Sequence, residues 1–268
     1  MYILGFETTG PICSVALLDL DDPSFVCLRE EKEPMGHLKH LAAYAEELMR
    51  EYGIQMREIA AVASSIGPGS FTGIRIGVTT ARAVAQALGI PCVAVPTLDA
   101  FRCKSLDSNI IVPIINARRG QVYGAIFSGV DGKEEILPPG PYMLVDVLDK
   151  LKAYLDSDTD NSSEERKTLE VSFYGDGIDA YWDLLTEFKN EIESKSAHRI
   201  IFVEESERYQ TANMVVRYAL DKYKNKEVVN FDALLPDYMR KAEAEQKLED
   251  GTLKKLREEK LARLMKGN

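Results

Sequence analysis

Short apolar runs alternate along the chain with stretches in which apolar residues recur at helical spacing. Apolar and β-branched runs at 2–9, 12–19 and 25–31 predict three strands, and Gly10-Pro11 predicts a tight turn between the first two. Residues 38–52 place apolar side chains on one stripe, which predicts a helix. We therefore expect the chain to begin with a hairpin-led sheet and a covering helix.

The next elements have the order strand, helix, strand. Residues 59–66 form a nearly continuous apolar run, which is typical of a parallel strand that is covered on both faces. A glycine-rich loop follows, and helical spacing then extends over 72–88 before a second apolar run at 91–96. This order predicts a right-handed parallel crossover.

The second half repeats the layout of the first. Residues 110–117 and 121–128 predict a strand pair around Arg118-Arg119-Gly120, and a shift of 110 positions aligns Gly10 with Gly120. We interpret this as a weak internal duplication, with two unrelated hairpins as the alternative. The elements expected after it are a helix at 144–155, a polar loop at 156–167, a strand at 169–174, a helix at 179–192, a strand at 199–204, a helix at 209–224, a short helix at 238–249 and an amphipathic helix through Leu253, Leu256, Leu261 and Leu264.

This pattern predicts an α/β protein with an N-terminal lobe at 1–105, a C-terminal lobe at 106–235 and a helical basic extension at 236–268.

The formal net charge of −10 argues against broad, unaided nucleic-acid binding. The stretch from Arg240 to Lys266 has nine basic and six acidic residues, so contact with tRNA phosphates and a solvated surface helix are both hypotheses for it.

Cysteines and targeting features point to a cytoplasmic location. The four cysteines lack CxxC spacing and mostly lie in apolar runs, which favours buried thiols in a reducing compartment. The histidines show no metal-ligand spacing, so no metal site is predicted. No apolar stretch is long enough for a membrane span, and the first residues resemble a strand rather than a signal peptide.

A candidate nucleotide or anion site lies where the glycine-rich loop follows a buried strand and precedes a helix. Glycines let a backbone approach an anion, and free amides at a helix N-terminus can hold it. The spacing fits neither GxGxxG nor GxxxxGK[ST], so a structural turn is the alternative. A carboxylate in the first hairpin could hold a magnesium-bound water, or simply accept hydrogen bonds within the hairpin. The candidates are Glu7, Thr8, Thr9, Gly67, Gly69, Ser70 and Thr72.

The helices at 38–52 and 72–88 carry small or aromatic residues off their apolar stripes. Small residues allow another helix to approach closely, so these two helices are a candidate partner interface. Packing within the same lobe is the alternative. The candidate interface residues are Leu41, Tyr44, Ala45, Leu48, Gly73, Gly77, Thr80, Ala83 and Ala87.

Five segments along the chain are characteristic of one protein family: LGFETT at 4–9, CSVALL at 13–18, SIGPGSFTGIRIG at 65–77, NARRGQVY at 116–123 and PDYMR at 236–240. Through these segments the chain resembles the TsaB (YeaZ) family over most of its length up to residue 240. It implies an actin/Hsp70/sugar-kinase-like fold of two duplicated lobes, with mixed sheets flanked by helices. The family usually has Asp where this chain has Glu7, and nothing in the resemblance extends to the residues after about 245.

The resemblance also implies a role and partners. In bacteria, TsaB pairs with its catalytic paralogue TsaD and with the ATPase TsaE. The three together transfer a threonylcarbamoyl group from its adenylate to the adenosine beside the anticodon of tRNAs that read ANN codons. We therefore expect a TsaD-like and a TsaE-like partner, a homodimer in isolation, and tRNA contact only through the complex. The only expected ligand is ATP or ADP with magnesium, held weakly or at the subunit interface.

Two replaced residues distinguish this chain from the catalytic paralogue. TsaD-type proteins carry a metal-binding HxxxH pair, which corresponds here to Thr97 and Phe101. A threonine and a phenylalanine cannot replace two imidazole ligands. The resemblance thus implies a non-catalytic subunit. An independent ATP-dependent kinase or hydrolase that uses Glu7 and the glycine-rich loop is the first alternative, and a metalloprotease is a weaker one.

Overall fold

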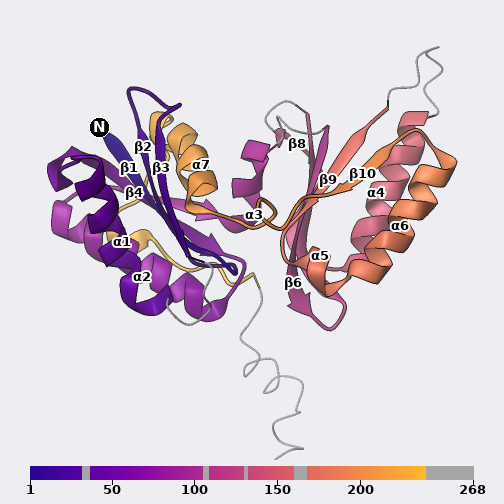
Figure 1. The fold of residues 1–268 in the computed structure, drawn as a ribbon, viewed down its shortest axis with the longest axis horizontal. Helices are drawn as coiled ribbons and strands as arrows, with labels where there is room; N and C mark the ends of the chain where they lie inside the picture. Colours follow the sequence, from indigo (N-terminus) through magenta and orange to yellow (C-terminus); the bar gives the residue numbers. More distant parts are fainter. Residues whose placement is uncertain (32–36, 105–108, 130–131, 160–167, 240–268) are drawn as a thin grey trace, which may run out of the picture. The chain divides into compact units, whose positions relative to one another are not determined.

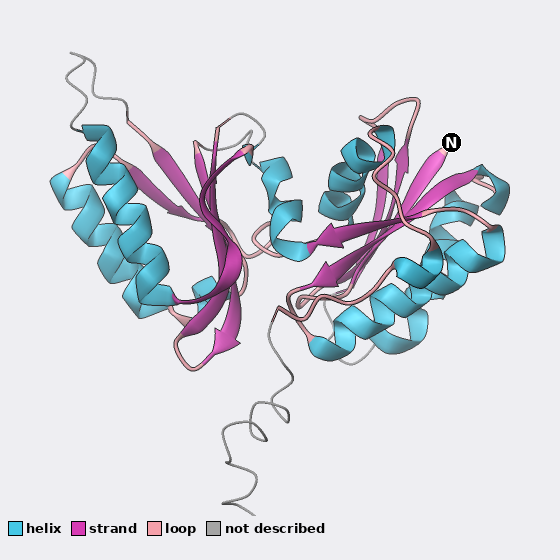
Figure 2. Cartoon of the chain, turned by 180° about the vertical axis from the view of Figure 1, so that it is seen from behind, coloured by secondary structure: helices cyan, strands magenta, loops and turns pink. Residues whose placement is uncertain are grey.

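The computed structural model describes residues 1–31, 37–104, 109–129, 132–159 and 168–239 (Figures 1 and 2). Contact clustering separates a compact unit at Met1–Asp237 from a second unit at Tyr238–Asn268. All helices and strands described below belong to the first unit. The helices predicted at 238–249 and through Leu253–Leu264 lie outside the described residues, except for the first two positions.

The first sheet has five strands in the order β3-β2-β1-β4-β5. They are β1 (Tyr2–Glu7), β2 (Cys13–Asp19), β3 (Val26–Glu31), β4 (Ile59–Gly67) and β5 (Cys92–Pro96). Within the N-terminal meander the pairs β1–β2 and β2–β3 are antiparallel, whereas the pairs β1–β4 and β4–β5 are parallel. The predicted crossover through a helix therefore connects the two parallel strands β4 and β5.

The second sheet repeats this topology, with the order β10-β9-β6-β7-β8. Its strands are β6 (Ile110–Arg118), β7 (Gln121–Ser128), β8 (Glu134–Met143), β9 (Glu170–Tyr174) and β10 (Arg199–Phe202). The pairs β6–β7 and β7–β8 are antiparallel, and the pairs β6–β9 and β9–β10 are parallel. Each strand thus has a counterpart in the first sheet, so the predicted duplication and the actin-like α/β fold are confirmed.

Helices cover both faces of the first sheet (Figure 1). Helices α1 (His37–Glu51) and α2 (Phe71–Leu88) pack on one face, and α7 (Ala212–Lys224) packs on the other. Helix α7 comes from the range 106–235, which the sequence analysis assigned to the C-terminal lobe. Its buried face contacts β1 and β2 instead, so the chain returns to the first sheet after completing the second.

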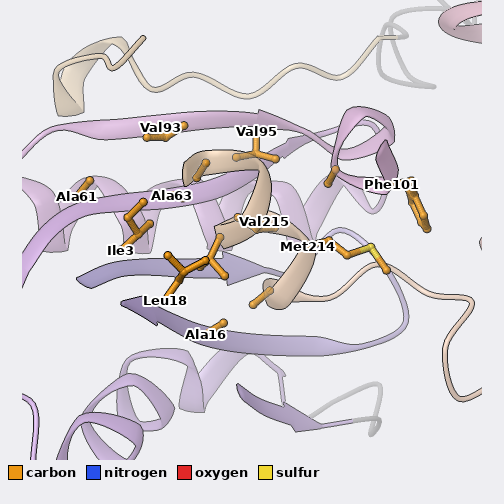
Figure 3. Packing of buried hydrophobic residues seen from close by; sticks show 14 of the residues in the cluster. Ile3, Ala16, Leu18, Ala61, Ala63, Val93, Val95, Phe101, Met214 and Val215 are labelled. Carbon is orange, nitrogen blue, oxygen red and sulfur yellow. The ribbon is translucent and has the colours of Figure 1, made fainter. Parts of the chain in front are cut away.

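The core between α7 and the first sheet combines several alanines with larger apolar side chains (Figure 3). Ala16, Ala61 and Ala63 lie beside Ile3 and Leu18 of the same sheet. A Cβ on Gly5 would stand 2.4 Å from a methyl carbon of Val216, so Gly5 lets the helix approach the strand closely. This close packing explains why the strands show an almost unbroken run of small and apolar residues.

One face of the second sheet is covered by α4 (Leu144–Thr159) and α6 (Trp182–Lys195), with the short α5 (Gly177–Ala180) beside them (Figure 2). Helix α4 extends past its predicted end at 155, and the rest of the predicted loop, 160–167, lies outside the described residues. The short helical segments elsewhere are α3 (Thr97–Ala100), η1 (Met56–Glu58), η2 (Phe101–Lys104) and η4 (Phe231–Ala233).

Strand β10 ends the second sheet, and side chains of α6 cover its outer edge at Ile200. The amide N–H of Ile200 donates to Oε1 of Glu193 at 3.0 Å, and its carbonyl accepts from Nζ of Lys189 at 2.8 Å. Lys189 and Glu193 also form an i, i+4 ion pair at 3.7 Å. Both outward-facing backbone groups of this residue are therefore satisfied within the chain.

The cysteines follow the prediction of buried thiols for three of four positions. Cys13, Cys27 and Cys92 are buried, and Cys103 is half-exposed. Burial raises the pKa of the Cys13 and Cys92 thiols to about 11.

Among the described residues, no helix combines the length and apolar character that a bilayer span requires.

Candidate functional site

The carboxyl end of β1 delivers a buried carboxylate to the first hairpin. Glu7 is 0% exposed, and its Oε1 accepts hydrogen bonds from the N–H of Thr9 at 2.5 Å and from Oγ1 of Thr9 at 2.6 Å. Its Oε2 accepts a hydrogen bond from Oγ of Ser65 on β4. Burial raises the pKa of Glu7, and the hydrogen bonds from Ser65 and Thr9 oppose that shift. Both oxygens of this carboxylate are thus engaged by protein donors.

Thr9 connects the hairpin to two distant segments. Its Oγ1 lies 3.3 Å from Nε2 of Gln210, which precedes α7, and 3.4 Å from Oγ1 of Thr97 at the start of α3. Nearby, Oγ of Ser14 accepts the amide N–H of Ala212 at 2.8 Å. The hairpin, α3 and the start of α7 are therefore joined by one buried polar cluster.

The glycine-rich loop packs directly on this hairpin. A Cβ on Gly69 would stand 2.4 Å from the carbonyl oxygen of Thr9, and one on Gly73 would stand 1.8 Å from that of Thr8. A Cβ on Gly67, the first glycine of the loop, would stand 2.0 Å from the carbonyl oxygen of Asp237. These approaches are closer than any Cβ could tolerate, so backbone packing within the chain accounts for all three glycines.

The start of α2 is capped within the same contact. Oγ of Ser70 accepts the N–H of Gly73 at 3.2 Å, while the N–H of Ser70 donates to the carbonyl of Thr9 at 2.7 Å. Oγ1 of Thr8 donates to the carbonyl of Gly73 at 2.7 Å. Hydrogen bonds in both directions therefore fix the loop to the hairpin.

The candidate anion residues mostly come together, as the sequence predicted. Glu7, Thr8, Thr9, Gly69 and Ser70 are in mutual contact, with Gly67 adjacent, whereas Thr72 is exposed on the first turn of α2. Their contacts are those of the structural turn that was the alternative hypothesis. Anion binding stays a prediction.

Sequence reasoning missed part of this cluster. Ser65 carried a signal, because Ser64-Ser65 is a polar pair inside the apolar run of β4. Gln210 carried none, because it lies 201 positions from Thr9 along the chain. Only the packing of α7 on the first sheet brings the two together.

Thr97 and Phe101, the two positions that the resemblance matches to a histidine pair, belong to the core. Both are 0% exposed, and the ring of Phe101 lies 5.8 Å from that of Tyr174 on β9. Neither side chain is exposed to solvent. Across the residues described by the structure, no three His, Cys, Asp or Glu side chains gather as a ligand set.

The candidate interface residues divide between core and surface. Leu41, Ala45 and Leu48 are buried beneath α1, and Gly77 is buried against Oγ1 of Thr8 and Oγ of Ser64. The prediction that these four contact a partner is therefore wrong, because apolar spacing on a helix marks the face toward its own sheet. A Gly77→Arg substitution would disrupt the fold, because even a Cβ there would stand 2.5 Å from Oγ1 of Thr8.

The other candidates lie closer to solvent. Ala83 and Ala87 are exposed on α2, and Thr80 and Gly73 are half-buried there. Tyr44 on α1 is half-buried, and its hydroxyl donates to the carboxylate of Glu31, which raises the pKa of Tyr44 to about 12. The candidate residues that are at least partly exposed therefore lie on the outer side of α2 and, for Tyr44, on α1.

Comparison with known proteins places these features in a family. A family model for tRNA N6-adenosine threonylcarbamoyltransferase (TsaD) matches residues 33–248. The chain is 27% identical over 249 residues to the tRNA threonylcarbamoyladenosine biosynthesis protein TsaB of Bacillus subtilis, which covers 92% of this chain and 97% of that protein. It is 32% identical over 128 residues to Escherichia coli TsaB, covering 47% of this chain and 54% of the relative.

A solved structure shares the fold. YeaZ from Pseudomonas aeruginosa superposes with a TM-score of 0.64 and 22% sequence identity, over 88% of this chain and 99% of the YeaZ chain. The two-sheet architecture is thus common to both proteins. Together with the match to the family model over most of its length, this means that the chain belongs to the TsaD family of tRNA N6-adenosine threonylcarbamoyltransferases and, within it, to the TsaB (YeaZ) branch of tRNA threonylcarbamoyladenosine biosynthesis.

Proposed function

We propose that this chain is a non-catalytic subunit of the complex that transfers a threonylcarbamoyl group from threonylcarbamoyl-AMP to the adenosine beside the anticodon of ANN-reading tRNAs. Its partners are a TsaD-like catalytic paralogue, which it binds and supports, and a TsaE-like ATPase. The observation that supports the proposal is the burial of Thr97 and Phe101 in the core. The resemblance matches these two positions to the metal-binding histidines of the paralogue. A hydroxyl and a phenyl ring cannot supply the two imidazole ligands.

The outer face of α2 is the proposed docking surface for the catalytic subunit. The helix contains no acidic residue along its 18 positions, and Thr72, Thr79, Ala83 and Ala87 are exposed on it. Phe71, Arg75 and Gln86 are exposed on the same helix. The short side chains at Thr79, Ala83 and Ala87 suit a closely packed helix–helix interface. A homodimer would use an overlapping face, so self-association and binding of the catalytic subunit compete.

The alternative of an independent ATP-dependent enzyme draws little support from the glycine-rich loop. Its glycines already admit the main chain of Thr8, Thr9 and Asp237, and both oxygens of Glu7 accept hydrogen bonds from the chain. A phosphate group would have to displace these contacts. We therefore favour the subunit role over ATP turnover by the chain alone.

Reconstitution tests the proposal directly. The catalytic paralogue, the ATPase, threonylcarbamoyl-AMP and unmodified tRNA are combined with and without this chain, and modified adenosine is measured by mass spectrometry of the digested tRNA. We expect modification to require the chain, and we expect the chain alone to give no product. Product from the chain alone, or equal modification in its absence, would contradict the proposal.

A further inference from the structure

The turn between β6 and β7 has an unusual backbone for its residues. Arg118, Arg119 and Gly120 have φ angles of 64°, 56° and 77°, so all three lie in the left-handed region. Hairpin turns of this kind normally use Asn-Gly or Asp-Gly, because a Cβ clashes with the following carbonyl in that conformation. The turn therefore keeps two arginines at positions that disfavour them. Such outliers are concentrated at functional sites.

Neighbouring elements hold the turn rigidly. Oδ1 of Asn116 accepts the N–H of Arg118 at 2.8 Å, and the N–H of Asn116 donates to Oδ1 of Asp176 at 2.9 Å. The hydroxyl of Tyr181 donates to the carbonyl of Gln121 at 3.1 Å. Contacts from the β9–α5 loop and from the start of α6 thus fix the main chain that carries both arginines. A site fixed in advance loses little entropy when it binds.

The two side chains point outward from this rigid base. Arg118 and Arg119 are exposed, and they form the single Arg-Arg pair of a chain whose net charge is −10. No carboxylate of the described residues lies within ion-pair distance of Arg118. The neighbouring acid, Asp176, is half-buried and accepts a main-chain amide instead. The turn therefore carries two exposed guanidinium groups on a protein whose net charge is negative.

We infer that the β6–β7 turn is a phosphate-binding element in which Arg118 and Arg119 contact the backbone of the tRNA bound by the complex. The inference rests on the proposed function, which supplies a polyanionic ligand. Guanidinium groups bind phosphate oxygens through paired N–H donors, and such contacts position a nucleic acid without reading its sequence. An acidic surface of a partner protein is the competing ligand, and the test separates the two.

The experiment uses the complete complex with the double variant Arg118→Asn/Arg119→Asn. Asparagine tolerates the left-handed region, so the turn is retained and its strain falls while both charges are lost. Binding of unmodified tRNA is titrated over a range of salt concentrations. We expect affinity at low salt to fall roughly tenfold or more, and the slope of log K against log salt to decrease by about one to two units.

Three further measurements define the outcome. The melting temperature of the double variant should equal or exceed that of the wild type, and Arg118→Lys/Arg119→Lys should retain most of the salt slope because it keeps the charge. Arg199→Asn, at an exposed arginine on β10, is the matched control and should leave tRNA binding unchanged. Wild-type affinity and slope in the asparagine pair would overturn the inference.

Failure of this inference is distinguishable from failure of the proposed function. If the asparagine pair loses binding to the catalytic subunit and keeps the affinity of the assembled complex for tRNA, the arginines bind protein and the inference is overturned. If tRNA modification proceeds fully without the chain, the proposed function itself fails. Only reduced tRNA affinity with intact subunit assembly supports the phosphate-binding role.

Discussion

Asp237 and Gly67 meet through their main chains: the carbonyl oxygen of Asp237 lies 2.0 Å from the position that a Cβ on Gly67 would occupy. The N–H of Asp237 also donates to the carbonyl of Ile66 at 2.7 Å. Gly67 has a φ angle of 118°, which other residues rarely adopt. The last residue of the compact unit is thus held by the end of β4, at the point where the glycine-rich loop begins.

Substitution of Gly67 by alanine should therefore destabilise the chain strongly. The added Cβ would both strain the backbone and displace Asp237, and we expect a loss of about 2–4 kcal/mol in the free energy of unfolding. Gly89→Ala is the matched control, because Gly89 also has a positive φ of 64° but nothing within 4 Å of a Cβ. It should lose about 1 kcal/mol. Urea denaturation measures both, and equal losses would show that the Asp237 contact contributes little.

The proposed docking face predicts the effect of a single charge on α2. Ala83→Glu should weaken binding of the catalytic subunit at least tenfold, because a carboxylate buried without a partner loses several kcal/mol of hydration. Ala83 is exposed, so the melting temperature should stay close to that of the wild type.

The control for this prediction is Ala153→Glu, at an exposed alanine inside helix α4. It introduces the same side chain on a helix that lies against the second sheet, and it should leave subunit binding intact. Co-purification and calorimetric titration with the catalytic subunit measure both variants. Undiminished binding of the Ala83→Glu chain would exclude α2 as the docking face.

The buried carboxylate predicts a pH dependence of stability. Because burial raises the pKa of Glu7 above its usual value of 4.5, the folded chain still holds the proton when the unfolded chain has released it. As the pH rises from about 4.5 to the raised pKa, Glu7 therefore lowers the free energy of unfolding, by up to about 1.4 kcal/mol per pH unit. Above the raised pKa this contribution is constant.

Glu7→Gln removes this titration. The stability of the Gln variant relative to the wild type should increase with pH through that window, as measured by urea denaturation at several pH values. Glu46→Gln, at an exposed carboxylate on α1, controls for the change in net charge. A difference between Glu7→Gln and wild type that stays constant with pH would show that Glu7 titrates as it does in the unfolded chain.

Local sequence patterns were enough to predict most elements, but β8 was missed. This strand contains Pro138-Pro139 and Gly140, which disfavour strands because proline lacks an N–H and glycine has no side chain to pack. It is tolerated because β8 is an edge strand, where one row of backbone groups needs no partner in the sheet. Edge position is a property of the whole sheet, which no local window of residues contains.

The candidate site shows the same division between local and distant information. The contact of Glu7 with Thr9 could be anticipated, because the two residues lie only two positions apart at the start of the first hairpin connection. The positions of Gln210 and Asp237 could not, because they depend on how α7 and the chain after it return to the first sheet. The spare small residues of α2 were also ambiguous, since Gly77 serves internal packing while Ala83 faces solvent.

Ile200 presents no available donor or acceptor along the outer side of β10, since Lys189 and Glu193 occupy both. A strand from another molecule would have to break two charge-assisted hydrogen bonds before it could add to the sheet at this point. At Ile200 the edge strand β10 therefore offers no free backbone group to which another strand could pair. This contact opposes edge-to-edge aggregation of the second sheet at that residue.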